Sequence, residues 1–214
     1  MERKSIVILG AGGLAREVFW HARDVYSSTE NFIFVDDVSN ISELEIGNNT
    51  YSVVNDWDFS RLNVEGFIIG VGSPQVKMIM VDKALKAGLR PLPTVIHSRA
   101  LVQDPTINCG LGGFIGPGCI LTTNIKFGDY VVLNLNCTIG HDAEIGDYVT
   151  VNPGCQVSGN CYLGKGASLG TGTVVKEKTF IAEFAVTGAQ AAIVRDIVDP
   201  GVYAGVPAQL LKRI

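Results

Sequence analysis

A strict six-residue repeat constrains this chain more than any other feature. An apolar residue recurs every six positions, and four residues after each of these lies a small or apolar residue, from Cys119 to Ala185. A hexapeptide repeat of this length predicts a parallel β-helix. The repeated position is apolar in twelve consecutive hexads: Ile115, Leu121, Phe127, Leu133, Ile139, Ile145, Val151, Val157, Leu163, Leu169, Val175 and Ile181.

The repeat also predicts how the coils stack. Three hexads make one triangular coil, so residues 18 apart should lie above one another at about 4.8 Å. Ile96 and Val102 keep the same phase upstream, before a slip around 107–113. Glycines such as Gly116 and Gly140 directly follow the apolar position, and we expect them at corners where positive φ costs glycine little.

The N-terminal part follows a different pattern. A buried strand, a glycine turn and an amphipathic helix are predicted over 6–24, and a second strand over 32–37. A third strand over 67–74 leads into a helix over 75–90. Strands that alternate with helices predict a small parallel sheet, and about three such units are half of a full dinucleotide-binding fold.

The chain therefore divides into two predicted domains. Residues 1–94 form a Rossmann-like α/β domain, and residues 95–214 form an all-β parallel β-helix of hexapeptide repeats with a C-terminal tail. A net charge of −4 without any run of Lys or Arg argues against nucleic-acid binding.

Cysteine usage and hydropathy bear on the compartment. An odd count of five cysteines without a secretory signal predicts reduced thiols in a cytoplasmic protein. No apolar stretch approaches the roughly 20 residues that a membrane span needs, so no membrane insertion is expected. Cys119, Cys137 and Cys155 are 18 apart, which predicts a stacked column of small core residues.

His141 and Asp142 stand out because they place an imidazole beside a carboxylate in a repeat of small and aliphatic residues. At a corner, a neutral imidazole could accept a proton from an attacking amine or hydroxyl. Gly159, one coil further on, would leave room for a thioester and offer a backbone N–H to an oxyanion. The alternative is an exposed corner residue without a role. We disfavour it because other corner pairs, such as Pro117–Gly118, are turn formers.

The segment 10-GAGGLARE-17 predicts a phosphate site at a helix N-terminus. Gly12 and Gly13 would let the backbone approach the phosphate, and Asp36 or Asp37 at the end of the next strand would bind a ribose hydroxyl. A dinucleotide cofactor is the rival interpretation, but the domain is too short for both halves of such a site.

The β-helix, with its terminal segment 204-AGVPAQLLKR-213, resembles the hexapeptide acyltransferases. With the nucleotide-binding domain in front, the whole chain resembles the nucleotide-aminosugar N-acetyltransferases and sialic-acid O-acetyltransferases of the PglD/NeuD-like group. The resemblance implies a left-handed β-helix and a homotrimer with active sites between neighbouring subunits. It also implies acetyl-CoA as cosubstrate and a nucleotide sugar bound by the N-terminal domain.

The resemblance assigns roles to particular residues. It implies that Asp142 orients His141, and that Asn134, seven residues before the histidine, assists. Residues at matching positions would contact CoA or the nucleotide sugar, and no metal is implied. For CoA, beside Gly159, these are Thr150, Thr171 and Ala189; for the nucleotide sugar they are Gly12, Gly13, Leu14, Asp36, Asp37, Gly72 and Ser73.

Four functions follow from these features. The first is an acetyl-CoA-dependent N-acetyltransferase that acts on a nucleotide-linked amino-deoxysugar in surface-glycan biosynthesis, with His141 as base. The second is an O-acetyltransferase acting on a sialic acid or another glycan hydroxyl. A zinc-dependent β-helix carbonic anhydrase would need three convergent histidines, and His21 and His97, in the N-terminal helix and the first coil, cannot converge with His141. A scaffold or binding module remains as the non-enzymatic alternative.

Overall fold

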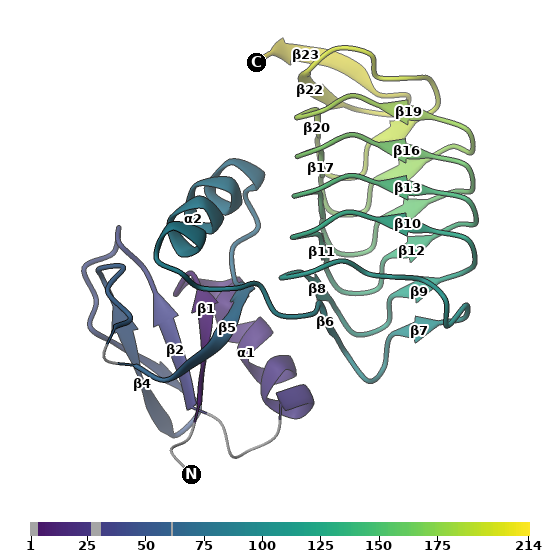
Figure 1. The fold of residues 1–214 in the computed structure, drawn as a ribbon. Coiled ribbons are helices and arrows are strands. Elements are labelled where there is room, and N and C mark those ends of the chain that lie inside the picture. Colours follow the sequence, from purple (N-terminus) through teal and green to yellow (C-terminus); the bar gives the residue numbers. More distant parts are fainter. Residues whose placement is uncertain (1–3, 27–30, 61) are drawn as a thin grey trace.

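The computed structural model describes residues 4–26, 31–60 and 62–214, so the first three residues of the predicted N-terminal domain lie outside it. The chain forms an α/β domain and a parallel β-helix that lie side by side (Figure 1). The predicted fold class is confirmed for both parts. Within the described residues, no helix is long and apolar enough to cross a membrane.

The N-terminal domain is built on a five-stranded sheet in the order β3-β4-β2-β1-β5. Four strands are parallel, but β3 runs antiparallel to β4, so the sheet is mixed and not purely parallel as predicted. The Gly47–Asn48 pair between β3 and β4 is a two-residue hairpin signal, and the prediction of a purely parallel sheet did not take it into account. The strands are β1 (Ser5–Leu9), β2 (Asn31–Val35), β3 (Glu43–Ile46), β4 (Asn49–Val54) and β5 (Val64–Ile69).

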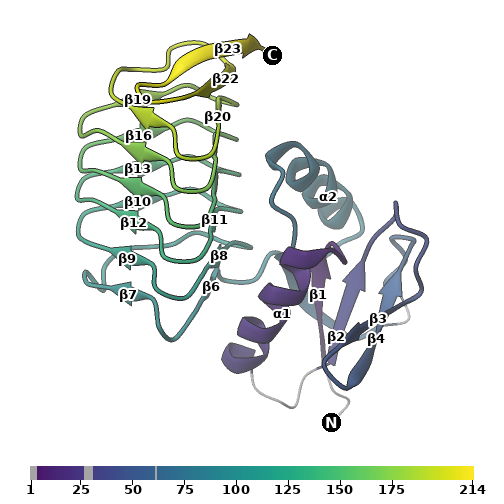
Figure 2. The same ribbon diagram turned by 180° about the vertical axis from the view of Figure 1, so that it is seen from behind.

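Two helices cover the sheet, α1 (Gly13–Tyr26) on one face and α2 (Pro74–Lys86) on the other (Figures 1 and 2). Helix α2 begins where the sequence directs it, because Ser73 caps it by accepting a hydrogen bond from the N–H of Val76, and Pro74 occupies its first turn. It ends four residues earlier than predicted, before Gly88, whose φ of 80° terminates the helix.

The β-helix has three faces, each a ladder of short parallel strands. Its final hairpin, β22 with β23, is antiparallel and closes the C-terminal end. The first face holds β6 (Val95–Ile96), β8 (Phe114–Ile115), β11 (Val132–Leu133), β14 (Thr150–Val151), β17 (Ser168–Leu169), β20 (Val186–Thr187), β22 (Gly201–Ala204) and β23 (Gln209–Arg213). The second face holds β7 (Leu101–Val102), β9 (Ile120–Leu121), β12 (Thr138–Ile139), β15 (Gln156–Val157), β18 (Val174–Val175) and β21 (Ala192–Ile193). The third face holds β10 (Lys126–Phe127), β13 (Glu144–Ile145), β16 (Tyr162–Leu163) and β19 (Phe180–Ile181).

The register confirms the predicted stacking. Val132 pairs with Thr150 and Thr150 with Ser168, so residues 18 apart are neighbours. The first coil differs, since Ile96 pairs with Ile115 across 19 residues, which accounts for the slip in the sequence. Both inward series line the core, where Phe127 alone of the repeated apolar positions is only partly buried.

All five cysteines are buried and free, as the repeat predicts. Cys119, Cys137 and Cys155 lie in one column, each with its Sγ near carbonyl oxygens of the coil that follows. Burial raises the pKa of the Cys109 thiol to about 11 and also raises the pKa of Cys161. All five side chains are therefore packed in the core.

The prediction that glycines such as Gly116 and Gly140 adopt positive φ at corners is wrong. A Cβ on Gly140 would lie 2.5 Å from the backbone nitrogen of Gly159, so these glycines are needed for close packing between coils. Positive φ occurs two residues later, at positions such as Gly118 and Asn136. The same position also accepts Tyr130 with φ of 59°, so the repeat tolerates side chains that are not turn formers.

The two domains are joined by buried polar contacts between α2 and the first face of the β-helix. Lys77 on α2 has no exposed surface, and its ammonium donates hydrogen bonds of 3.0 Å to the carbonyls of Tyr130 and Val149. Burial lowers the pKa of Lys77 well below its ordinary value. The hydroxyl of Thr150 on β14 donates to the carbonyl of Gly72, in the loop between β5 and α2, at 2.6 Å.

Candidate active site and nucleotide-binding edge

His141 lies at the corner where the chain passes from the second face to the third, between β12 and β13. Its side chain is 58% exposed, because the corner carries it away from the coil. The backbone there is held by neighbouring coils: the N–H of Asn160 donates to the carbonyl of His141 at 2.7 Å. The imidazole therefore projects from a rigid frame.

Asp142 has a φ of 58°, a conformation that aspartate tolerates better than most residues. Its Oδ2 lies 2.7 Å from Nδ1 of His141, so the expected contact within the pair is present. A carboxylate can only accept here, which puts the imidazole proton on Nδ1 and leaves Nε2 as an acceptor. The hydrogen bonds from His141 and Asn124 lower the pKa of Asp142, which favours the anion.

Gly159 lies directly against the imidazole, as the 18-residue stacking predicts. A Cβ there would lie 2.6 Å from Nε2 of His141, so any larger residue would displace the ring. The N–H of Gly159 donates no backbone hydrogen bond in the described part of the chain. This corner thus joins a free imidazole nitrogen with an unused backbone donor.

Asn134 does not reach this pair within one chain. It lies at the preceding corner, between β11 and β12, with its side chain partly buried. Its Oδ1 accepts the N–H of Leu135 at 2.8 Å, which is a local backbone role. Residues of the second face separate Asn134 from His141.

The three residues expected along CoA fall into two groups. Thr171 and Ala189 are exposed and lie 18 apart on the corner between the first and second faces. Thr150 is 2% exposed, and its hydroxyl is bonded to Gly72. Its side chain is therefore committed to the contact between the domains.

At the other site, the predicted nucleotide residues converge on one edge of the sheet. Because β2, β1 and β5 are parallel neighbours, the loops that follow them lie together at their carboxyl ends. These loops carry Gly12 and Gly13 after β1, Asp36 and Asp37 after β2, and Gly72 and Ser73 after β5.

Gly12 and Gly13 are exposed, and a Cβ on either would meet nothing within 4 Å. Neither has positive φ, so the fold of the chain itself does not demand glycine there. Open backbone at the start of α1 is what close approach of a phosphate requires. Leu14 is partly buried, and its Cδ2 would lie 3.7 Å from a Cβ on Gly72, so it borders the same edge.

The two aspartates differ in what they can still bind. Oδ1 of Asp36 accepts the N–H groups of Val38 and Ser39, each at 2.9 Å, and within the described residues its Oδ2 receives no hydrogen bond. Asp37 pairs with Lys83 and accepts the indole N–H of Trp57 at 3.0 Å. These bonds lower the pKa of Asp37, with that from Lys83 the larger cause. Both bonds to Asp37 go to Oδ2, so each aspartate keeps one carboxylate oxygen for a ligand, but the charge of Asp37 is already paired with Lys83.

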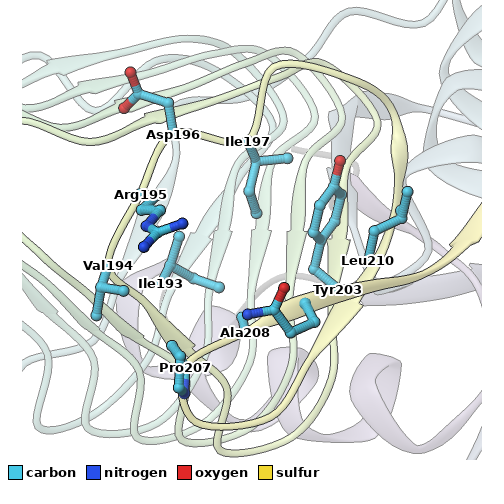
Figure 3. Close-up of a pocket in the computed structure, with 10 residues that line it drawn as sticks. Ile193, Val194, Arg195, Asp196, Ile197, Tyr203, Pro207, Ala208 and Leu210 are labelled. Carbon is cyan, nitrogen blue, oxygen red and sulfur yellow. The ribbon is translucent and has the colours of Figure 1, made fainter.

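Two of the cavities are lined mainly by residues that the sequence did not assign to a site, although Gly13 borders one of them. One of about 410 Å³ lies between α1 and the β3–β4 turn, lined by Gly13, Arg16 and Trp20 among others. Another of about 280 Å³ lies at the C-terminal mouth of the β-helix, where Figure 3 shows Ile193, Tyr203 and Leu210 around it. Among the described residues no group of three or more His, Cys, Asp or Glu side chains is arranged to hold a metal ion.

Comparison with known families matches each half separately. Residues 5–84 match the PglD N-terminal domain, and residues 142–177 match the bacterial transferase hexapeptide model of six repeats. The chain thus combines a segment similar to the PglD N-terminal domain with repeats similar to those of the bacterial hexapeptide transferases. No curated protein matches the sequence of this chain significantly.

Solved structures similar to this chain match nearly its whole length. The acetyltransferase domain of PglB from Neisseria gonorrhoeae FA1090, in complex with acetyl coenzyme A, is 25% identical with a TM-score of 0.86, over 98% of this chain and 100% of that one. WeeI from Acinetobacter baumannii AYE is 29% identical with a TM-score of 0.86, over 97% and 100%. PerB from Caulobacter crescentus, in complex with CoA and GDP-perosamine, is 24% identical with a TM-score of 0.84, over 96% of each chain, and supports the fold alone.

Lys77, Asp104 and Asn124 make polar contacts at these sites that sequence reasoning missed. Lys77 lies in a helix with other lysines, and no pattern marks it as buried. Asn124 could have been found, because it lies 18 residues before Asp142 in the predicted column.

Proposed function

We propose that this protein is an acetyl-CoA-dependent N-acetyltransferase that acts on the amino group of a nucleotide-linked amino-deoxysugar in surface-glycan biosynthesis. The observation that carries the proposal is the His141–Asp142 pair at an exposed corner of a hexapeptide β-helix, with Nε2 free beside Gly159. The similarity to a PglB acetyltransferase domain that binds acetyl coenzyme A supports the donor. The PglD N-terminal domain supports a nucleotide sugar as acceptor.

The reaction joins the sugar nitrogen to the acetyl carbon and breaks the carbon–sulfur bond of the thioester. Nε2 of His141 accepts the proton that the amine loses, and Asp142 stabilises the imidazolium that results. The N–H of Gly159 would donate to the oxyanion of the tetrahedral intermediate. The thiol of CoA leaves and recovers a proton from His141 or from water.

The N-terminal domain would hold the nucleotide. The N-terminus of α1, with Gly12 and Gly13, binds the phosphates through backbone N–H groups, and Leu14 borders the same site. Asp36 accepts a hydrogen bond from the ribose or the base, and Gly72 and Ser73 close the opposite side of the edge. Asp37 supports the loop through Lys83, and its Oδ1 would remain available to the ligand.

The assembly we propose is a homotrimer. Asn134, Thr171 and Ala189 lie at a different corner from His141, so they can act in the same site only if neighbouring subunits contribute them. Apolar side chains on the second and third faces are 37–44% exposed, and a subunit interface would cover them. These side chains are Ile120, Val174, Tyr162 and Phe180.

An O-acetyltransferase is the second candidate, since the same base would serve a hydroxyl. A hydroxyl must lose its proton to attack, whereas a neutral amine can attack first and lose its proton afterwards. Replacing His141 should therefore cost an O-acetyltransferase more activity than an N-acetyltransferase.

The test is incubation with acetyl-CoA and a panel of acceptors, with products identified by mass spectrometry. The panel contains UDP-, dTDP- and GDP-linked 4-amino-sugars, sialic acid and simple glycans. We expect acetylation of one nucleotide aminosugar and a loss of at least about 100-fold in kcat with His141→Ala. Transfer only to a hydroxyl would establish the second candidate, and no transfer by a folded oligomer to any acceptor would overturn both.

A further inference from the structure

Two side chains, those of His141 and Asn124, hold the carboxylate of Asp142 in place. Asn124 lies one coil earlier in the same column, and its side-chain Nδ2 donates a hydrogen bond to Oδ1 of Asp142. The other oxygen, Oδ2, accepts from Nδ1 of His141. Each carboxylate oxygen of Asp142 therefore has its own donor, and the two donors fix the plane of the carboxylate.

Asn124 is in turn held by a second acidic residue, Asp104. Oδ2 of Asp104 accepts the hydroxyl of Thr123 at 3.0 Å and the backbone N–H of Asn124 at 3.2 Å. Its Oδ1 accepts the backbone N–H and the hydroxyl of Thr106 at 2.9 and 2.6 Å. These bonds, those from Thr106 the largest, hold the pKa of Asp104 well below its ordinary value. In the described part of the chain no Lys, Arg or His forms an ion pair with Asp104.

The network spans three successive coils. Asp104 follows β7, Asn124 follows β9 and Asp142 follows β12, all at the corner that leaves the second face. The network begins in the first coil, which has no described strand on the third face. There the side chain of Asp104, instead of a backbone carbonyl, accepts the N–H of Asn124.

We propose that Asn124, held in place by Asp104, is a positioning residue for the His141–Asp142 pair. It fixes Asp142 so that Oδ2 faces Nδ1 of His141, which holds the imidazole in the tautomer that leaves Nε2 free beside Gly159. The inference rests on the proposed role of His141 as base. Neither Asn124 nor Asp104 touches the reacting atoms.

The alternative is that Asn124 serves the turn alone, since its φ is 52°. Asn136 and Asn160 also have positive φ, each 56°, and within the described residues their side chains donate no hydrogen bond to a carboxylate. The backbone requirement and the contact with Asp142 are therefore separate properties of Asn124, and substitution can separate them.

The test uses the full-length protein and the acceptor found in the panel. Asn124→Gly keeps the positive φ and removes the amide. We expect kcat to fall about tenfold, as for loss of a residue that orients a functional side chain, with KM for acetyl-CoA unchanged. Asn136→Gly is the control. It shows how much the same substitution changes the melting temperature at a corner outside the network.

A double-mutant cycle distinguishes a loss of positioning from general structural damage. In an Asp142→Asn background, Asn124→Gly should cause no further loss, because the residue through which it acts is already altered. Asn124→Asp places a second carboxylate beside Asp142, and we expect the acidic limb of the kcat/KM profile to move to higher pH. This variant also serves if Asn124→Gly fails to fold.

The outcomes separate this inference from the proposed function. Full kcat in folded Asn124→Gly, or an undiminished tenfold loss in the Asp142→Asn background, would overturn the positioning role. For Asn124→Asp, an acidic limb that does not move would overturn it equally. If His141→Ala itself retains full activity, the proposed base is wrong and the inference falls with it.

Discussion

At the scale of single residues, glycine serves three different purposes in this molecule. Gly118 supplies positive φ at a corner, whereas Gly140 and Gly164 allow adjacent coils to approach. Gly159 differs from both, because the group nearest to its absent Cβ is the side chain of His141 and not backbone. The same residue type in the same repeat is thus structural in some coils and tied to the candidate active site in another.

This difference predicts opposite effects for two alanine substitutions. In Gly159→Ala the new Cβ would push aside an exposed imidazole, so we expect normal stability but a loss of about tenfold or more in kcat. In Gly164→Ala the Cβ would lie 2.5 Å from the backbone nitrogen of Glu183, which cannot move without disturbing the coil. Here we expect a clear fall in melting temperature. Thermal unfolding and steady-state kinetics of both variants check this, and equal activity in Gly159→Ala and wild type would contradict it.

At the scale of elements, α2 connects the two sites. Its N-terminus carries Ser73 and the preceding Gly72 at the nucleotide edge, while Lys77, one turn later, is bonded to two carbonyls of the β-helix. Thr150 on β14 holds the same loop through Gly72. The position of the nucleotide edge relative to the β-helix is therefore set by these contacts.

Thr150→Val tests whether Thr150 serves docking or CoA binding. The substitution keeps the shape but leaves the carbonyl of Gly72 without its donor, which should lower the free energy of unfolding by about 1 kcal/mol. We expect KM for the nucleotide sugar to rise while KM for acetyl-CoA stays constant. Ser168→Ala, one coil further along the same face, is the matched control and should change neither. A rise in KM for acetyl-CoA alone would restore the CoA contact that the resemblance implies.

Helix α1 adds a pH-dependent contact to the same junction. His21 stacks on Phe114 of β8 at 5.3 Å between ring centroids and meets His97 edge-on at 4.4 Å. Burial, and then the neighbouring His97, lower the pKa of His21, with a smaller opposing effect from Asp24 and a lowering one from Arg99. In the folded protein His21 therefore binds a proton less readily than in the unfolded chain, whose pKa is 6.5.

Stability should consequently fall with acidification below the unfolded pKa of 6.5, because the unfolded state then takes up the proton first. The loss continues until the pH reaches the lowered pKa of folded His21. His21→Phe keeps the aromatic stacking and removes the titration, so its melting temperature should change less between about pH 7.5 and about pH 5.5. Parallel pH dependences in the two proteins would contradict the assignment.

At the scale of the whole molecule, one chain does not bring together all the residues that the resemblance assigns to one active site. His141 and Asp142 lie at one corner of the β-helix, and Asn134 lies at another, across the second face. The proposed trimer resolves this if each site takes His141 from one subunit and Asn134 from its neighbour. An assembly of this kind makes a prediction that does not depend on the substrate's identity.

His141→Ala and Asn134→Ala chains, each with reduced activity, should complement one another when they are mixed and reassembled. With random assortment, roughly a quarter of the sites would combine an intact histidine with an intact asparagine. Activity of the mixture above that of either parent, measured after denaturation and refolding together, checks the prediction. Mixing without reassembly is the control, and no recovery in mixed trimers would place Asn134 outside the site.

The sequence alone was sufficient to predict the β-helix, because its core is one-dimensional. Each inward position depends only on residues 18 before and after it, so twelve hexads specify the coil, the buried cysteines and the place of Gly159 beside His141. The strand–glycine–helix pattern likewise located the nucleotide edge. Local periodicity carries this information because the contacts repeat at fixed separations.

Tertiary structure decided what depends on contacts between distant segments. Lys77 meets Tyr130 and Val149, and Thr150 meets Gly72, across separations that follow no period in the sequence. The contact of Asp37 with Lys83 and the hold of Asp104 on Asn124 are of the same kind. A side chain's partners are set by where the chain returns in space, and only the folded molecule brings those partners together.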